Sequence, residues 1–425
     1  MSEKLRALIV GQSLELMMAM PATLGRAGFD VDAISTDKSL KKSRFILNFI
    51  HAENPHIFLK KLREENFDDY DFIIPCDDET LGLIKDSDFT IAQKLKLLPI
   101  KNEKNFAHIF SKIELSKTLS KAGVNTPQFE VAQGLAQVLE KAEKIGYPLM
   151  LKTNSANGGN GVFECETKKD FEKIDSRIFE NLVLIQKKII GCELDLSALY
   201  RDEKLIYFTF SKIEKVIGNK FGPSSLRSYE QLSEIDEKLF FEMQQLGAAL
   251  GANGFVTISC MESFEDKKRY FIEADMRPNS WVQFGKFFGN DVAIKIAKWF
   301  LHQEVLQFPI AANKKFPTKN LLPYFNRMSF AEIFSNRYGV LKYLPFEDYK
   351  ILFFLLRQKF YFEIFIPKKR FFLKSIEHIP TKIGRFLIRD KELRVKIRLT
   401  CKQLIKNSFA FIANKLCIFK KAHLR

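Results

Sequence analysis

The sequence predicts an α/β protein that begins with a parallel-sheet domain and ends in a basic, mainly helical extension. Short apolar runs alternate with helix-like segments through the first part of the chain, which is the rhythm of a parallel sheet covered by helices. The basic excess lies at the other end: residues 311–425 contain 26 Lys and Arg against 7 Asp and Glu, a net charge of +19. The whole chain of 425 residues carries +16, so residues 1–310 sum to −3. We expect a near-neutral body joined to a basic appendage.

The parallel-sheet domain is expected over residues 1–105. Apolar runs at Leu5–Val10, Phe29–Ser35 and Phe72–Pro75 predict strands, and Ile57–Asn66 predicts a short amphipathic helix. The turn after the first strand reads VGQSLE and lacks the GxGxxG pattern. A Rossmann-type dinucleotide site is therefore not expected.

An acidic triplet, Asp77, Asp78 and Glu79, follows the last of these strands. Open α/β sheets bind ligands at the carboxyl ends of their strands, so the triplet could hold an amine substrate. The same residues also suit the first turn of a helix, where a carboxylate caps free N–H groups and meets a favourable dipole. The sequence leaves both interpretations open.

The middle of the chain mixes strands and helices. Helices are expected over residues 106–124, 134–146 and 230–250, each ending at or next to a glycine. Strands are expected at Tyr147–Thr153, Val162–Glu166, residues 182–189, Glu193–Tyr200, Lys204–Lys212, Gly254–Glu262 and Arg269–Ala274.

A glycine-rich loop follows the strand that carries Lys152. Gly158, Gly159 and Gly161 lie within four positions. Glycines without Cβ atoms let backbone N–H groups close on phosphate oxygens, and Lys152 could add an ammonium to the same phosphates. No GxxxxGK[ST] occurs, so this is not a P-loop. The alternative is an ordinary flexible hairpin turn.

Two carboxylates and an arginine end the strand YFIEA. Glu273 and Asp275 are two residues apart, so on a strand both face one side. Paired hard oxygen ligands suit Mg²⁺ that also binds ATP phosphates. Arg277 projects from the same side, where it could neutralise a transferring phosphoryl group. The alternative is a solvated polar strand end.

Taken in chain order, these motifs resemble the ATP-grasp superfamily. The resemblance is to its carboxylate–amine ligase type, including carbamoyl-phosphate synthase large-chain-like and D-amino-acid ligase-like members. The residues that carry it are Lys112 with Gly123-Val124…Pro127, Tyr147-Pro148…Lys152…Gly158-Gly159-Asn160-Gly161, Gln186-Lys187-Lys188-Ile189, Glu193, and Glu273-x-Asp275-x-Arg277.

The resemblance implies a two-lobed α+β ATP-grasp domain that clamps Mg·ATP, or Mn²⁺ in place of Mg²⁺. Its expected parts are the N-lobe with the glycine lid at 106–180 and the C-lobe with the metal site at 181–309, before an extension at 310–425. The implied ligands of ATP are Lys112, Lys152, Gly158, Gly159, Gly161, Gln186, Lys187, Ile189 and Glu193. The implied catalytic residues are Lys152 and Arg277, and the implied metal ligands are Glu273 and Asp275.

Three positions depart from the family's pattern. Gln186 stands where an acidic hinge residue is usual, and Asp275 stands where the family has Asn. By spacing, Ser259 takes the place of a second metal carboxylate, with Glu262 three residues further on. Either Glu262 supplies that ligand through another register, or Glu273 and Asp275 hold the metal alone.

The function implied is that of an ATP-dependent ligase, which activates a small carboxylate as an acyl phosphate for attack by an amine. The alternative is a catalytically weak ATP-binding module whose basic tail docks on a membrane surface or a partner. Lys212, Lys215 and Arg227 are candidates for holding an anionic substrate, against solvated surface charge as the alternative.

The chain shows no secretory signal, no CxxC pair and no apolar run long enough to span a bilayer, so we expect a cytoplasmic protein with reduced cysteines. Its basic segments contain aromatic residues at near-helical spacing. Such segments could form a helical cap on the enzyme body, or they could bind the anionic surface of the inner face of a membrane. Nucleic acid is the least favoured partner.

Overall fold

The computed structural model describes residues 4–155, 159–218, 220–310 and 319–365. The chain forms two compact units, Met1–Leu356 and Arg357–Arg425. The described part of the second unit contains the end of α11 (Tyr349–Phe360) and a π-helical turn at Tyr361–Phe365. The basic, mainly helical extension expected beyond Phe365 lies outside the described residues. The remaining architecture belongs to the first unit.

The first sheet is parallel, as predicted. Its strands are β1 (Arg6–Gly11), β2 (Asp30–Ser35), β3 (Ile46–His51) and β4 (Phe72–Pro75), in the order β3-β2-β1-β4. The sequence pattern did not predict β3. This strand lies at the sheet edge, where Leu47 and Asn48 are exposed, and it lacks the clean apolar pattern of the inner strands.

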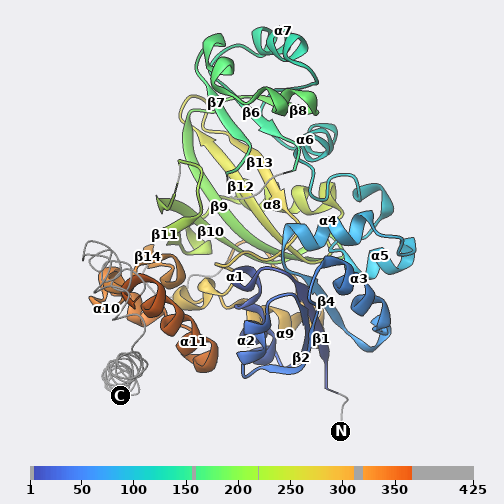
Figure 1. Ribbon diagram of the computed structural model, residues 1–425, viewed down its shortest axis with the longest axis vertical. Coiled ribbons are helices and arrows are strands. Elements are labelled where there is room, and N and C mark those ends of the chain that lie inside the picture. The colour runs from blue at the N-terminus through green and yellow to red at the C-terminus, as the bar shows by residue number, and fades with distance from the viewer. Residues whose placement is uncertain (1–3, 156–158, 219, 311–318, 366–425) are drawn as a thin grey trace, which may run out of the picture. The chain divides into compact units, whose positions relative to one another are not determined.

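Helices cover both faces of this sheet (Figure 1). On one side are α1 (Leu14–Met17) and α2 (Met20–Arg26). On the other are α3 (Pro55–Glu64), α4 (Asp78–Asp86) and α5 (Ile91–Leu97). The strands thus end inside a layered domain, with their carboxyl ends free to meet the next part of the chain.

A small lobe follows, built on an antiparallel sheet in the order β5-β8-β6-β7. The helix α7 (Leu135–Ile145) packs on it through Val138 and Ala142. The strands are β5 (Phe129–Ala132), β6 (Leu149–Thr153), β7 (Val162–Cys165) and β8 (Val183–Lys187).

The helix leading into this lobe starts later than the sequence predicted. It was expected from residue 106, but α6 spans only Lys112–Lys121. Phe110 has φ 55°, which a right-handed helix does not accommodate, and the Ser111 side chain then caps α6 by accepting the Glu114 N–H. The result places Lys112 in the first helical turn.

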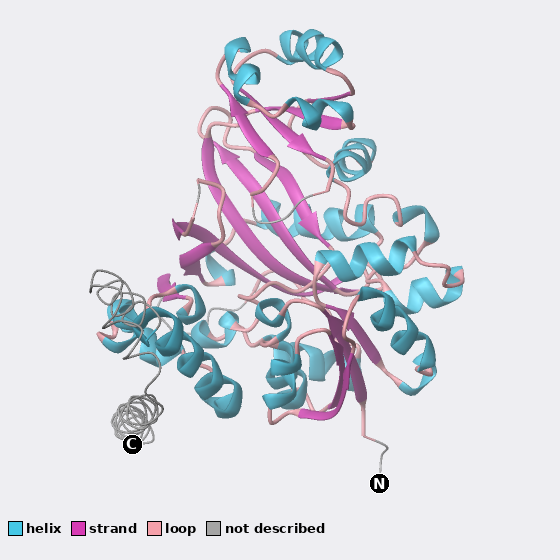
Figure 2. Cartoon of the chain, in the orientation of Figure 1, coloured by secondary structure: helices cyan, strands magenta, loops and turns pink. Residues whose placement is uncertain are grey.

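The central sheet has six antiparallel strands in the order β13-β12-β9-β10-β11-β14 (Figure 2). The strands β9 and β10 were both predicted, whereas β11 and β14 were not. The helices α8 (Glu237–Leu250) and α9 (Val292–His302) pack against β10. The strands are β9 (Gly191–Arg201), β10 (Lys204–Val216), β11 (Ser224–Glu230), β12 (Phe255–Ser263), β13 (Arg269–Asp275) and β14 (Lys319–Pro323).

The strand β14 corrects the expected start of the extension at residue 310. It pairs with β11, and α10 (Phe330–Phe334) and most of α11 follow it within the unit that ends at Leu356. Residues 319–356 therefore belong to the body of the protein. Pairing of β14 with β11 adds the edge strand to the central sheet, and charge composition alone could not show this.

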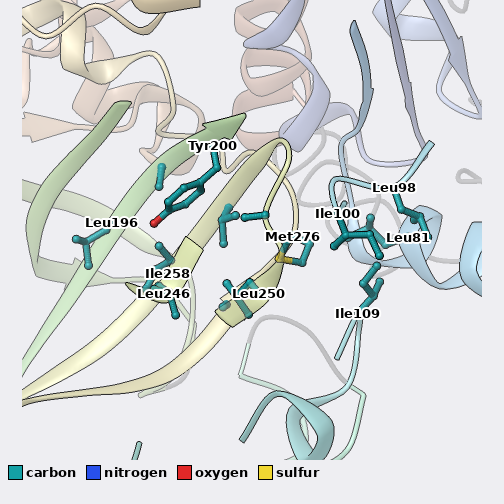
Figure 3. Close-up of a cluster of buried hydrophobic side chains, with 14 of the residues drawn as sticks. Leu81, Leu98, Ile100, Ile109, Leu196, Tyr200, Leu246, Leu250, Ile258 and Met276 are labelled. Atoms are coloured by element: carbon teal, nitrogen blue, oxygen red, sulfur yellow. The ribbon is translucent and has the colours of Figure 1, made fainter. Parts of the chain in front are cut away.

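One continuous apolar core joins the parallel-sheet domain to the central sheet. Leu98 and Ile100 come from the end of the first domain, while Leu196 and Ile258 come from the central sheet. Figure 3 shows these side chains with Leu246 and Leu250 of α8 and with Tyr200, whose hydroxyl donates to the Met243 carbonyl. In a shared core of this kind, side chains of both parts pack against one another.

Among the described cysteines, Cys76, Cys165 and Cys260 are buried free thiols and Cys192 is half-buried. In the described part of the chain, no helix has both the length and the apolar content needed to cross a membrane.

Candidate active site

A cavity of about 420 Å³ opens between the sheet of the small lobe and the central sheet. Its apolar walls include Met150, Ile213 and Met261. The predicted site residues that line it are Lys112, Lys152, Gly159, Gln186, Lys187, Ile189, Glu193 and Glu273. The structure therefore brings residues from five separate segments to one place.

Lys112 and Glu273 form an ion pair across this cavity, with 2.6 Å between Nζ and Oε1. The Lys112 N–H donates to the Asn154 carbonyl, which ties the start of α6 to the loop after β6. Burial opposes the charge on Lys112, but Glu273 and then Asp275 outweigh it and raise the pKa of Lys112. Burial likewise opposes the charge on Glu273, and Lys112 reverses it, so the pKa of Glu273 is lowered.

Lys152 lies beside this pair without a partner of its own. Its side chain is 7% exposed, and within the described residues its Nζ makes no hydrogen bond or ion pair. Burial lowers the pKa of Lys152 to about 8; Glu273 partly offsets this and the Lys112 charge adds to it. Among the described residues, the nearly buried Lys152 ammonium is therefore without an anion that would neutralise its charge.

The described glycines of the loop after β6 have strict steric reasons to be glycine. Gly159 has φ 79°, and a Cβ there would lie 2.4 Å from the Phe221 carbonyl oxygen. Gly161 has φ 65°, and its Cβ would lie 2.1 Å from Thr153 Oγ1. Gly159 lines the cavity, Gly161 packs behind it, and Gly158 lies outside the described residues. The loop thus folds tightly against the segment that follows β10.

The end of β8 offers few free polar groups. The Lys187 N–H donates to the Gln128 carbonyl and the Lys188 N–H to the Pro148 carbonyl. The Ile189 N–H has no backbone acceptor among the described residues. The Gln186 side chain is buried, and its Nε2 donates to Ser116 Oγ while its Oε1 has no donor. Two unsatisfied groups therefore remain at this edge of the cavity.

A carboxylate that the sequence analysis overlooked also lines the cavity. Glu164 of β7 pairs with Lys188 and with Lys220, which lies in the segment after β10. Hydrogen bonds from these two lysines lower the pKa of Glu164 to about 2. Only the position of Glu164 on the strand after the glycine loop could have suggested it, because its partners are distant in sequence.

Asp275 and Arg277 meet a residue of the first domain. Arg277 Nη2 lies 2.8 Å from Asp275 Oδ2 and 2.6 Å from Asp78 Oδ2. Burial and then Asp78 raise the pKa of Asp275 to about 8 against the opposing effect of Arg277. Asp275 shares a small cavity of about 20 Å³ with Lys112 and Glu273.

The residues of the acidic triplet have different roles: Asp77 caps a helix and Asp78 pairs with Arg277. Asp77 caps α4 by accepting the Thr80 N–H at 2.8 Å, and it also accepts the Ser13 N–H at 3.0 Å. Asp78 is buried against Arg277, whereas Glu79 is exposed. The helix-cap interpretation holds for Asp77.

The register of β12 and β13 shows where Ser259 and Glu262, the two residues considered at the second metal carboxylate, lie. Ser259 lies directly opposite Glu273, and Glu262 lies opposite Arg269. Glu262 Oε2 is 3.6 Å from Arg269 Nε and does not line the cavity. The structure does not bring Glu262 to the site, and the described residues contain no group of three side chains placed to hold a metal.

The three candidates for anion binding are occupied. Arg227 is buried with two hydrogen bonds to Asp195, at 2.6 and 2.8 Å, and its guanidinium lies over the Trp281 ring. Lys212 and Lys215 lie 3.7 Å from Glu230 and Glu332 respectively. Arg227 is therefore part of a buried structural network, and the two lysines have local acidic partners.

The sequence model of the ATP-grasp domain family matches residues 109–280. These residues are an ATP-grasp domain. The carbamoyl phosphate synthase large chain of Pyrococcus furiosus is 25% identical over 179 residues. That match covers 41% of this chain and 17% of the relative, so the chain spans about a sixth of that protein.

Solved structures share the fold of this chain over about three quarters of its length. The L-amino acid ligase from Bacillus licheniformis superimposes with a TM-score of 0.53 at 17% identity, covering 71% of this chain and 75% of that one. The biotin carboxylase domain of the 2-oxoglutarate carboxylase from Hydrogenobacter thermophilus, in complex with MgADP, ADP and bicarbonate, gives 0.56 at 14%, covering 75% and 74%. The residues that line the cavity of about 420 Å³ all lie within the range 109–280 that the family model matches.

Proposed function

We propose that the protein is an ATP-dependent ligase that activates a small carboxylate as an acyl phosphate for attack by an amine. The observation that carries this proposal is the convergence of Lys112, Lys152 and Glu273 on one cavity beside a tight glycine loop. The neighbours named as ligases or carboxylases support the same reaction class.

The residues of the cavity fit ATP. The unsatisfied Gln186 Oε1 and the free Ile189 N–H suit the amino group and ring edge of adenine. Glu193 can accept hydrogen bonds from ribose hydroxyls. Lys152 lacks an anion, and a phosphate would supply one. Gly159 allows the backbone to approach the phosphates closely.

The residues also fit one magnesium ion that arrives with the nucleotide. Glu273 and Asp275 would hold it, because both are carboxylates at the end of β13 and Mg²⁺ prefers oxygen ligands. The bound ion would supply charge neutralisation to the phosphates. A third carboxylate is missing from the facing position, which is Ser259.

The chain's contribution to the reaction is positioning and charge. The substrate carboxylate oxygen attacks the γ-phosphorus, the bond to the β-phosphate oxygen breaks, and ADP leaves. Arg277, which is paired with Asp78 and Asp275, would offset the charge of the transferring group. The amine then attacks the activated carbonyl carbon and releases phosphate. Exclusion of water by the glycine loop protects the acyl phosphate until that step.

A catalytically weak ATP-binding module is the second candidate, and Ser259 is the observation that favours it. The two candidates differ in turnover. We would screen amino acids and small carboxylates, with amines, for ADP formation stimulated in the presence of Mg²⁺.

Two variants test whether any stimulated ADP release comes from this cavity. The ligase proposal expects stimulated ADP release that Lys152→Ala and Glu273→Ala each reduce by at least a hundredfold, while the exposed Lys169→Ala retains it. ATP binding without stimulated release by any mixture would favour the weak module. Release that both cavity variants leave unchanged would refute the ligase at this cavity.

A further inference from the structure

The cavity of about 420 Å³ that we propose binds ATP is called the nucleotide cavity below. A second, polar cavity of about 280 Å³ lies far from it along β9. Glu193, near the start of this strand, faces the nucleotide cavity, and Arg201, its last residue, lines the second one. The two cavities share no lining residue. The second lies where the end of the first domain meets the central sheet, lined by Tyr70, Asp71 and Lys96 on one side and by Arg201 and Asn253 on the other.

Arg201 is packed in an unusual way for a charged side chain. Its guanidinium carbon lies 4.9 Å from the centre of the Phe72 ring and 5.4 Å from that of Phe300. Within the part of the chain that the structure describes, the guanidinium makes no hydrogen bond and no ion pair, and its Nε is shut off from solvent. The neighbouring Asp202 is directed to Lys101, 3.7 Å away.

The aromatic rings explain the position of Arg201 but not its missing partner. A cation over aromatic faces gains electrostatic stabilisation, yet the rings satisfy none of the five N–H donors. Burial lowers the pKa of Arg201, and Asp202 offsets this only in part. A guanidinium left this way is set up to accept a planar oxyanion through two parallel hydrogen bonds.

The other lining groups narrow the ligand. Lys96 is already paired with Asp68, so these two charges cancel. Asp71 uses one carboxylate oxygen to accept the Arg6 N–H at 2.8 Å and has no ion pair among the described residues. The Asn253 side chain accepts the Asp202 N–H through Oδ1 at 3.1 Å. Among the described residues, the cavity therefore presents one cation without an ion pair, Arg201, and one carboxylate without an ion pair, Asp71, and it has the size of a small metabolite.

We propose that this cavity binds a small carboxylate, with the carboxylate group on Arg201. A zwitterion such as an α-amino acid matches the lining best, because its ammonium group would meet Asp71. The site is separate from the nucleotide cavity and does not depend on the proposed ligase activity.

Isothermal titration of the full chain tests the proposal. The probes are acetate, L-alanine, L-glutamate and inorganic phosphate, each titrated with and without saturating ATP. The variants are Arg201→Gln, Arg201→Lys, Asp71→Asn and the control Arg177→Gln, an exposed arginine of the small lobe paired with Asp175.

We expect a carboxylate to bind the wild type whether or not ATP is present. Arg201→Gln should weaken this binding about tenfold or more, since a charge-assisted hydrogen-bond pair is lost, and Arg177→Gln should leave it unchanged. If an amino acid is the ligand, Asp71→Asn should weaken its binding and spare that of acetate.

The proposal is overturned if no carboxylate binds, if phosphate alone binds, if ATP displaces the carboxylate, or if Arg201→Gln leaves its affinity unchanged. Should Arg201→Gln fail to fold by circular dichroism, Arg201→Lys decides. It retains the charge between the rings but loses the paired donors. Weaker binding by this variant supports the proposal, and wild-type affinity refutes it.

Discussion

Replacing Lys152 by methionine should stabilise the protein without ligand and abolish its response to ATP. The cavity holds this ammonium nearly buried, at 7% exposure, and burial lowers its pKa from 10.5 to about 8. Each pKa unit corresponds to 1.36 kcal/mol, so the charged form costs about 3 kcal/mol of folding free energy at pH 7. Methionine has a similar length and no charge, and it should recover much of that amount.

The sign of the effect gives it a distinct pH dependence. Between pH 8 and pH 10.5 the unfolded chain keeps the Lys152 proton that the folded chain has lost. Stability rises with pH wherever the unfolded state binds more protons. The cost is therefore fully present below pH 8 and disappears toward pH 10.5, and the advantage of Lys152→Met should shrink over the same interval.

Thermal unfolding of the wild type, Lys152→Met and the exposed control Lys169→Met measures both effects. At pH 7 the melting temperature of Lys152→Met should rise by roughly 5 °C, whereas Lys169→Met should match the wild type. ATP at a hundredfold excess over its Kd should stabilise the wild type and the control by about 2.7 kcal/mol. The same ATP concentration should not shift Lys152→Met.

Three results would refute this reasoning. A Lys152→Met protein that unfolds at a lower temperature than the wild type would mean that Lys152 has a stabilising partner. An unchanged shift with ATP would mean that the nucleotide does not reach this lysine. A pH-independent difference between the two proteins would argue against a depressed pKa as its cause.

Three further substitutions test other parts of the structure. Asp195→Asn should lower the free energy of unfolding by about 3–5 kcal/mol in urea titrations, because Arg227 would remain buried with its charge uncompensated; a loss below about 1 kcal/mol would contradict the structural role given to this pair. Gly159→Ala should weaken ATP binding, measured by calorimetry, by at least about tenfold. The reason is that φ is 79° and the new Cβ would meet the Phe221 carbonyl. Unchanged affinity would show that the loop moves freely. Ser259→Glu should raise the affinity of Mn²⁺ for the ADP complex about tenfold, measured by electron paramagnetic resonance, since it adds a carboxylate opposite Glu273; equal affinity would place the metal elsewhere.

Much of the fold was predictable because it is encoded by local pattern. Buried strands appear as short apolar runs, and the helices α7 and α8 end where glycine takes positive φ, at Gly146 and Gly251. The strands β3, β11 and β14 were not predicted. β3 and β14 lie at sheet edges, where exposure weakens the apolar pattern, whereas the inner strand β11 (SSLRSYE) is mostly buried but contains few apolar residues.

The candidate site was predictable where its residues lie close together in the sequence. Lys152 precedes its glycine loop directly, and Glu273, Asp275 and Arg277 alternate along one strand end. Contacts between distant segments were not predictable. The pairs of Glu164 with Lys188 and Lys220 join the small lobe to the segment after β10, and no single stretch of sequence contains them.

By itself, the sequence determined the order of the elements, the glycine loop and the set of charges at the end of β13, because each depends on neighbours along the chain. Only the tertiary structure decided that Asp78 meets Arg277 and that Glu262 turns to Arg269, whereas the spacing had already placed Ser259 at the position of the second carboxylate. A bulge between Ser259 and Cys260 shifts the register of β12 and β13, and such shifts are set by packing between strands. The position of Glu262 beside Arg269, away from the carboxylates that we propose hold a metal, is therefore a consequence of strand pairing.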